Sequence, residues 1–210
     1  SGELMFTTEN YIESPQKFIE LLQSYFKCGK EDPKLTISKM DTERRKLLKD
    51  SIKRIFWKRH ILFPLAIVES GAEIGPDCEI GPFCVIGPLV KLARGVVLKS
   101  HVAITGDTQI GDDTIIWPFA SVGHQPQDLK FAGEATRLVI GARNMIRESA
   151  SINPGTAGGG GITQIGDDCL FMLGTHVGHD CKVGNRVVMA NHASLAGHVE
   201  IGDFAILGGL

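Results

Sequence analysis

The sequence lacks any long apolar run. Nowhere do its 210 residues approach the roughly 18 consecutive apolar residues of a membrane-spanning helix, so no membrane span is predicted. The first residues include Glu3, Glu9 and Glu13, whereas transit peptides are poor in acidic residues. We therefore expect a cytoplasmic protein. The formal net charge of -2 also lacks the basic excess of whole-surface nucleic-acid binding, so no nucleic-acid partner is expected.

Paired cysteines are lacking too. The chain has 5 cysteines, an odd count without a C-x-x-C pair, in a protein large enough to fold without cross-links. Reduced thiols are therefore expected. The one compositional excess is glycine, with 25 residues that lie almost entirely after residue 70.

Residues 1–60 carry the pattern of a helical N-terminal extension. Two amphipathic helices are predicted, in "SPQKFIELLQSYFKCG" (14–29) and "DTERRKLLKDSIKRIFWKR" (41–59). Lysine and arginine clearly outnumber acidic residues in 41–60. This excess is either the solvated face around a packing stripe or a docking surface for an acidic partner.

From Val68 onward the sequence has a strict period of six residues. Every sixth position is large and apolar through three runs, and 11 of these positions are followed by glycine: Val68, Ile74, Ile80, Ile86, Leu92, Leu98, Ile104, Ile110, Ile116 and Val122; then Ile140, Ile146 and Ile152; then Ile165, Phe171, Val177, Val183, Met189, Leu195, Ile201 and Leu207. The residue two positions earlier is usually small or apolar. Neither a helix nor an alternating strand gives a period of six.

This period predicts short strands joined by tight corners. Three sides of six residues close one coil of 18, so residues 61–210 are predicted to form about seven coils of an all-β, left-handed parallel β-helix; hexapeptide solenoids have this hand as a class. The two breaks, 124–137 and 153–164, are predicted to be loops ejected from corners. Four glycines at 158–161 lack the flanking strand, helix and lysine of a phosphate-binding loop, so we interpret them as part of a corner loop.

The register then orients the residues of "THVGHDC" (175–181). Thr175, Val177 and Cys181 should point into the coil, which excludes a Cys–His nucleophile pair. His176 should point outward. His179 should lie on a corner, with Asp180 beside it on the surface.

Stacking adds a second histidine to that corner. One coil of 18 residues beyond His179 is Gly197, whose neighbour is His198, so these residues should lie within one or two strand spacings. A zinc site is an alternative, although no ligand-spacing motif is present and we expect no metal. A general base beside an oxyanion donor fits better, because histidine can take a hydroxyl proton near neutral pH and a backbone N–H can stabilise a developing oxyanion.

Several motifs resemble one enzyme family. "THVGHDC", "NHASLAGHVEIGDFAILGG", "QPQDLKFAGEATRLVIG", "NMIRESASINPGT" and "EIGPFCVIGP" are similar to segments of the UDP-N-acetylglucosamine 3-O-acyltransferases, the acyl-carrier-protein-dependent enzymes that begin lipid A synthesis. The resemblance runs from about residue 64 to residue 210. The combination of H-x-x-H-D-C with Q-D-L-K-[FY]-A-G-E is specific to that family.

The resemblance implies a mechanism. His179 would be the general base for the sugar 3-hydroxyl, Asp180 its orienting partner and the Gly197 N–H the oxyanion donor. The residues implied to contact the sugar, nucleotide or acyl group are Gln127, Asp128, Lys130, His176 and His198. It further implies a homotrimer with active sites between subunits, a 3-hydroxyacyl chain on acyl carrier protein as donor, and no metal or dissociable cofactor.

The sequence also departs from the family. The chain ends at Leu210 in mid-coil, so we expect it to lack the later coils and C-terminal helices, and residues 1–60 are foreign to the pattern. Phe63 stands where a histidine is usual, and His192 where an asparagine is usual. Two alternatives follow: an N-acyltransferase acting on a UDP-amino-sugar, and a catalytically idle trimeric β-helix that serves as a scaffold or is a fragment.

Overall fold

The computed structural model describes residues 60–62 and 65–210. The helices predicted in 1–60, including the basic segment, therefore lie outside the described residues except for His60. His60, which the sequence predicts to be part of the helical extension, instead begins the first strand. In the part of the chain that the structure describes, no helix is long and apolar enough to cross a membrane.

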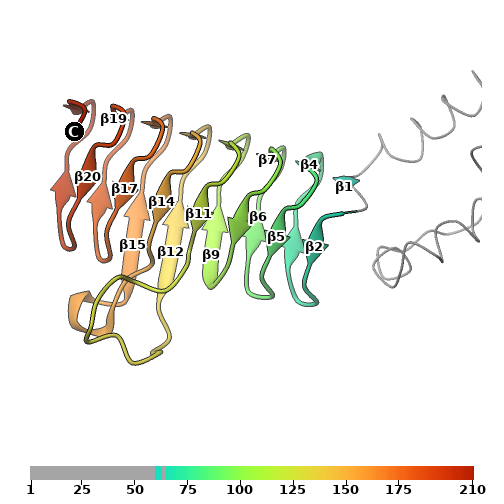
Figure 1. The fold of residues 1–210 in the computed structure, drawn as a ribbon, viewed down its shortest axis with the longest axis horizontal. Helices are drawn as coiled ribbons and strands as arrows, with labels where there is room; N and C mark the ends of the chain where they lie inside the picture. Colours follow the sequence, from blue (N-terminus) through green and yellow to red (C-terminus); the bar gives the residue numbers. More distant parts are fainter. Residues whose placement is uncertain (1–59, 63–64) are drawn as a thin grey trace, which may run out of the picture. The chain divides into compact units, whose positions relative to one another are not determined.

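The described chain forms three parallel β-sheets, named A, B and C here (Figure 1). Sheet A contains β1 (His60–Leu62), β4 (Cys78–Ile80), β7 (Val97–Leu98), β10 (Ile115–Ile116), β13 (Met145–Ile146), β16 (Leu170–Phe171), β19 (Val188–Met189) and β22 (Ile206–Leu207). Sheet B contains β2 (Ile67–Val68), β5 (Val85–Ile86), β8 (Ala103–Ile104), β11 (Ser121–Val122), β14 (Ser151–Ile152), β17 (His176–Val177) and β20 (Ser194–Leu195). Sheet C contains β3 (Glu73–Ile74), β6 (Lys91–Leu92), β9 (Asp107–Ile110), β12 (Arg137–Ile140), β15 (Ile162–Ile165), β18 (Lys182–Val183) and β21 (Glu200–Ile201).

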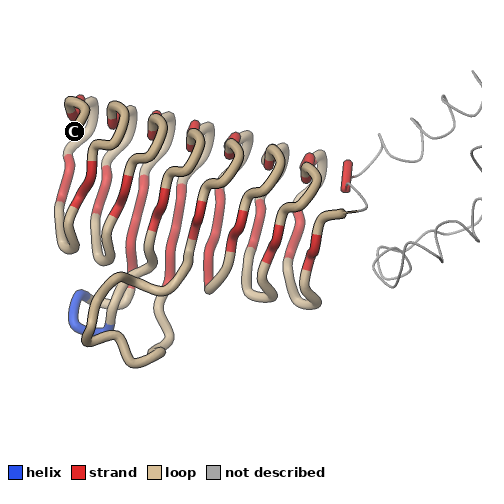
Figure 2. Tube along the Cα trace, viewed as in Figure 1, coloured by secondary structure: helices blue, strands red, loops and turns tan. Residues whose placement is uncertain are grey.

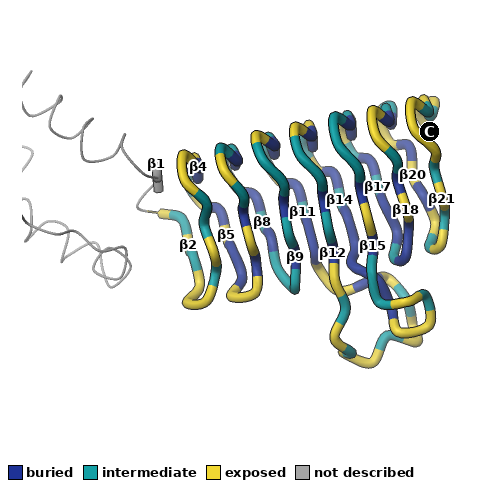
Figure 3. The backbone as a smooth tube through the Cα atoms, turned by 180° about the vertical axis from the view of Figure 1, so that it is seen from behind, coloured by how far each residue is buried: buried dark blue, intermediate teal, exposed yellow. Residues whose placement is uncertain are grey.

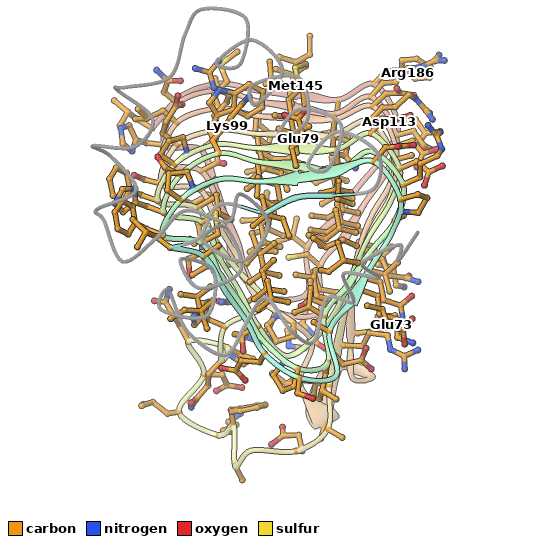
Figure 4. The ribbon with its side chains drawn as sticks, turned by 90° about the vertical axis from the view of Figure 1, so that its right-hand side faces the viewer. Glu73, Glu79, Lys99, Asp113, Met145 and Arg186 are labelled. Atoms are coloured by element: carbon orange, nitrogen blue, oxygen red, sulfur yellow. The ribbon has the colours of Figure 1, made fainter. Side chains whose placement is uncertain are left out.

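Successive strands along the chain pass from one sheet to the next, so each turn through three sheets makes one coil. In coils without a long loop, paired residues are 18 positions apart, as for Glu73 and Lys91. Figure 2 shows that these short strands and their corners make up almost all of the β-helix, and Figure 4 shows its triangular outline along the axis. The predicted left-handed parallel β-helix of hexapeptide repeats is confirmed.

The core is a column of side chains inside the triangle. From β2 to β22 every strand ends on a residue of the six-residue period, and nearly all of these residues are buried. The residue two positions earlier also points inward, as Cys181 does, and four cysteines of the described chain fill such positions as free thiols: Cys78, Cys84, Cys169 and Cys181. Periodic residues in the end coils, such as Val68 and Leu207, are only partly buried, because a neighbouring coil of the β-helix covers them on one side only.

The corners explain the repeated glycines. The residue three positions before each periodic residue usually has positive φ, and most residues there are not glycine, for example His192 at 61°. The glycine that follows a periodic residue is needed for another reason. A Cβ on Gly178 would lie 2.8 Å from the backbone carbon of Ala196 in the next coil. Coils therefore approach too closely there for a side chain.

The outer faces of the three sheets differ in character. Sheet A presents an apolar row, each member paired with the next: Val97, Ile115, Met145, Leu170, Val188 and Ile206. Sheet C presents charged pairs, including Lys91–Glu73 and Lys182–Glu200 at 2.7 Å. Sheet B changes from apolar residues in the first coils to serine and histidine in later ones. Figure 4 shows Met145 on sheet A and Glu73 on the side of sheet C.

Both predicted loops leave the corner between sheets B and C. Pairing across the first loop joins residues 30 apart, and pairing across the second joins residues 25 apart, instead of 18. The observed loops are shorter at their C-terminal ends than predicted, because β12 already begins at Arg137 and β15 at Ile162. The two loops project together from one corner (Figures 1 and 3).

Candidate active site

The predicted pair His179 and Asp180 is assembled on the corner beneath these loops. His179 follows β17, and its Nδ1 lies 2.8 Å from Oδ2 of Asp180. Because an ionised carboxylate can only accept a hydrogen bond, Nδ1 must carry the proton in neutral His179. The Nε2 lone pair is then left free to accept a proton, which is the state a general base requires.

The predicted surface position of Asp180 is wrong. Its side chain is fully buried, whereas that of His179 is 17% exposed. The register does direct Asp180 away from the core, but the loop 153–161 folds over it. The N–H and hydroxyl of Thr156 donate to Oδ1 and Oδ2 at 2.8 and 2.6 Å. The N–H of Asp180 donates to the hydroxyl of Thr163 at 2.8 Å.

These donors determine the charge state of Asp180. Burial alone would raise its pKa, but the hydrogen bonds from Thr156 and the interaction with His179 outweigh burial, so the pKa lies below the usual value. Asp180 is therefore ionised at neutral pH. An ionised partner holds the His179 ring in one tautomer and stabilises positive charge on it during proton transfer.

The predicted stacking of Gly197 and His198 above His179 is confirmed. A Cβ on Gly197 would lie 2.4 Å from Cε1 of His179, so the backbone of Gly197 packs directly against the imidazole. Within residues 65–210 the Gly197 N–H has no hydrogen-bond acceptor. The ring of His198 meets that of His179 edge-on at a centroid distance of 5.0 Å, and its Nε2 is 3.9 Å from Oδ2 of Asp180.

His176 borders the same corner on the outer face of sheet B, as predicted. Its Nδ1 lies 2.8 Å from the hydroxyl of Ser151 in the preceding coil. Partial burial and then the nearby His179 lower the pKa of His176. A neutral imidazole here can donate or accept a hydrogen bond without adding charge beside His179.

The first-loop residues are not brought to His179 within the described chain. Gln127 and Lys130 are exposed, and Asp128 accepts the Lys130 N–H within its own turn at 3.0 Å. The loop instead reaches the site through Glu134, whose Oε1 accepts the N–H of Ala157 at 3.1 Å. Glu134 thus ties the first loop to the second, which covers Asp180.

His179, Asp180 and His198 are also ligand types for a transition metal, with ligand atoms within 4.8 Å of one another. Both oxygens of Asp180 already accept hydrogen bonds, and the Nδ1 of His179 donates one of them. A cation bound to Asp180 would compete with these hydrogen bonds. The donor set therefore fits acid–base chemistry better than metal binding.

Known structures resemble the β-helix closely. A UDP-N-acetylglucosamine acyltransferase of known structure is 52% identical, with a TM-score of 0.68 over 70% of this chain and 56% of that chain. LpxA from Acinetobacter baumannii is 46% identical, with a TM-score of 0.68 over 69% and 56% of the two chains. The Campylobacter jejuni UDP-N-acetylglucosamine acyltransferase is 43% identical, with a TM-score of 0.68 over 70% and 57%. No protein-family model matches the chain.

The β-helix is homologous to the UDP-N-acetylglucosamine acyltransferases. The resemblance stated from the sequence motifs is thereby confirmed. The chain spans little more than half the length of these acyltransferases, 56% and 57% in two of them.

Three polar residues around the His179–Asp180 dyad were not predicted from the sequence. Thr163 could have been found, because it lies one coil of 18 residues before Cys181 and hence next to the backbone of Asp180. Ser151 likewise occupies the strand position that pairs with His176. Thr156 gave no such signal, because it lies in a loop outside the period.

Proposed function

We propose that the protein transfers a 3-hydroxyacyl chain from acyl carrier protein to the 3-hydroxyl of UDP-N-acetylglucosamine, in lipid A synthesis. The observation that carries the proposal is the His179–Asp180 hydrogen bond with the Gly197 backbone against the same imidazole. The homology to UDP-N-acetylglucosamine acyltransferases supports the choice of substrate.

The proposed reaction is direct acyl transfer. The Nε2 of His179 takes the proton of the sugar hydroxyl as its oxygen attacks the thioester carbonyl carbon. The Gly197 N–H donates to the oxyanion of the tetrahedral intermediate. Collapse breaks the carbon–sulfur bond, and the proton on Nε2 passes to the leaving thiolate. The thioester is already activated, so this chemistry requires no metal or dissociable cofactor.

The remaining predicted residues are assigned to binding. Gln127, Asp128 and Lys130 project on the exposed loop beside the catalytic corner, where they can reach a substrate or a neighbouring subunit. The ring of His198 meets that of His179 edge-on, and His176 lies on the outer face of sheet B beside the same corner, so both can contact a substrate bound at Nε2 of His179.

A homotrimer is part of the proposal and is supported by the three different faces. The apolar outer row of sheet A is expected to be buried against another surface, whereas the ion pairs of sheet C are compatible with exposure to solvent. The corner between sheets A and B carries an exposed stack of Phe83, His101 and Phe119, with ring centroids 4.8 and 5.1 Å apart. If this corner faces a three-fold axis, sheet A of one subunit faces sheet B of the next. The His179 corner then borders their interface.

The decisive experiment supplies the purified chain with UDP-N-acetylglucosamine and 3-hydroxyacyl carrier proteins of several chain lengths. Mass spectrometry should find the 3-O-acyl product. The corresponding 3-amino sugar nucleotide, offered in a parallel reaction, distinguishes amine acylation. A folded trimer that acylates neither acceptor would overturn the proposal and favour the idle scaffold.

A further inference from the structure

We propose that Thr156 and Gly159, in the loop between β14 and β15, position the His179–Asp180 dyad. This inference rests on the proposed function only for its kinetic consequences. The arrangement itself concerns how one buried carboxylate is held, and it can be tested without a substrate.

Thr156 supplies two of the three hydrogen bonds that the Asp180 carboxylate accepts. Its N–H binds Oδ1, and its hydroxyl binds Oδ2, the oxygen that also accepts Nδ1–H of His179. Charge-assisted bonds of this kind hold a carboxylate in a defined orientation. The direction of the His179 hydrogen bond therefore depends on Thr156.

The backbone of Gly159 packs against the same carboxylate. It ends the 3-10 turn η2 (Ala157–Gly159), and a Cβ built on it would lie 2.0 Å from Cγ of Asp180. No L side chain can replace Gly159 without displacing either the turn or the carboxylate. A Cβ built on its neighbour Gly158 would have no atom within 4 Å. The four glycines at 158–161 are therefore unequal, and the one at 159 is required by Asp180.

The loop is itself held in place. The N–H groups of Gly159 and Gly161 donate to the carbonyl of Thr156, and the N–H of Ala157 donates to Glu134. Without this loop, the outward-directed carboxylate of Asp180 would be exposed to water. Water would then compete for its hydrogen bond with His179, and the imidazole would be held less firmly in one tautomer. Thr156 and Gly159 thus act through Asp180 and need no contact with substrate.

The test compares the full chain with Thr156→Val, Thr156→Ser, Gly159→Ala and Gly158→Ala. In protein labelled with ¹⁵N-histidine, a carboxylate-bound Nδ1–H gives a downfield proton signal, assigned to His179 by its loss in His179→Gln. We expect wild type, Thr156→Ser and Gly158→Ala to keep this signal. Thr156→Val and Gly159→Ala should shift it upfield or lose it, with cooperative thermal unfolding retained.

Kinetics provide the second readout. In Thr156→Val, kcat should fall about tenfold to a hundredfold with little change in KM, and Thr156→Ser should restore kcat. An unchanged Nδ1–H signal in Thr156→Val and Gly159→Ala overturns the inference, even if acyl transfer is confirmed. If the chain transfers no acyl group, the signal still decides the inference separately from the proposed function.

Discussion

The Nδ1 of His179 lies 2.8 Å from an Asp180 oxygen that is fully buried, although the coil directs Asp180 outward. The ejected loop 153–161 thus converts a surface carboxylate into an enclosed one. Enclosure removes competing water from the His179–Asp180 bond, so the imidazole is held in the tautomer that a general base needs.

Asp180→Asn should keep the shape of the dyad but not its function. An amide cannot hold the same His179 tautomer with the same charge, so kcat should fall by about 10² to 10⁴. Asp203→Asn is the matched control, because Asp203 is exposed on a distant corner where it accepts a backbone N–H. Comparable losses in steady-state kcat for both variants would contradict the assigned role.

Gly197→Ala should displace the His179 ring. The added Cβ would meet the imidazole at 2.4 Å, and a shift of about 1 Å can reduce turnover about a hundredfold. Gly202→Ala is the control, since a Cβ there has no atom within 4 Å. Both variants should unfold at temperatures near that of wild type. If their kcat values are also equal, Gly197 has no part in placing the base.

Acid should remove the stabilisation that Asp180 provides. Its pKa is lowered on folding, so its contribution to the free energy of unfolding is present above the unfolded-state value of about 3.9 and is lost as pH falls through the lower folded value. Denaturant unfolding of wild type and Asp180→Asn should therefore differ most near neutral pH and converge below pH 3. If the difference in free energy of unfolding grew on acidification, the pKa of Asp180 would be raised rather than lowered on folding.

The apolar row on sheet A should govern assembly. Met145→Glu places a charge in the middle of that row, which a subunit interface would have to desolvate, so the proposed trimer should dissociate in sedimentation velocity. Gln164→Glu makes a similar change on the outer face of sheet C, where water should remain, and should leave the trimer intact. Retention of trimers by Met145→Glu would place the interface elsewhere.

The sequence predicted the coil well because its rule is local and repeated. Each periodic residue, such as Val177, must fill the same core position, so the strand register follows from counting residues. Counting by 18 also predicted that Gly197 lies next to His179. Asp180 was misplaced for the opposite reason. Its burial depends on Thr156 and Gly159, which lie in a loop without a period, and only the folded path of that loop brings them to the carboxylate.

His179→Ala tests the central claim most directly. In the acyl-transfer assay with UDP-N-acetylglucosamine, this variant should form product at least a thousandfold more slowly than wild type while remaining a folded trimer. His192→Asn, which changes an exposed histidine on another corner, should retain near wild-type rates. If His179→Ala turns over at the rate of His192→Asn, His179 is not the base, and the proposed site is contradicted.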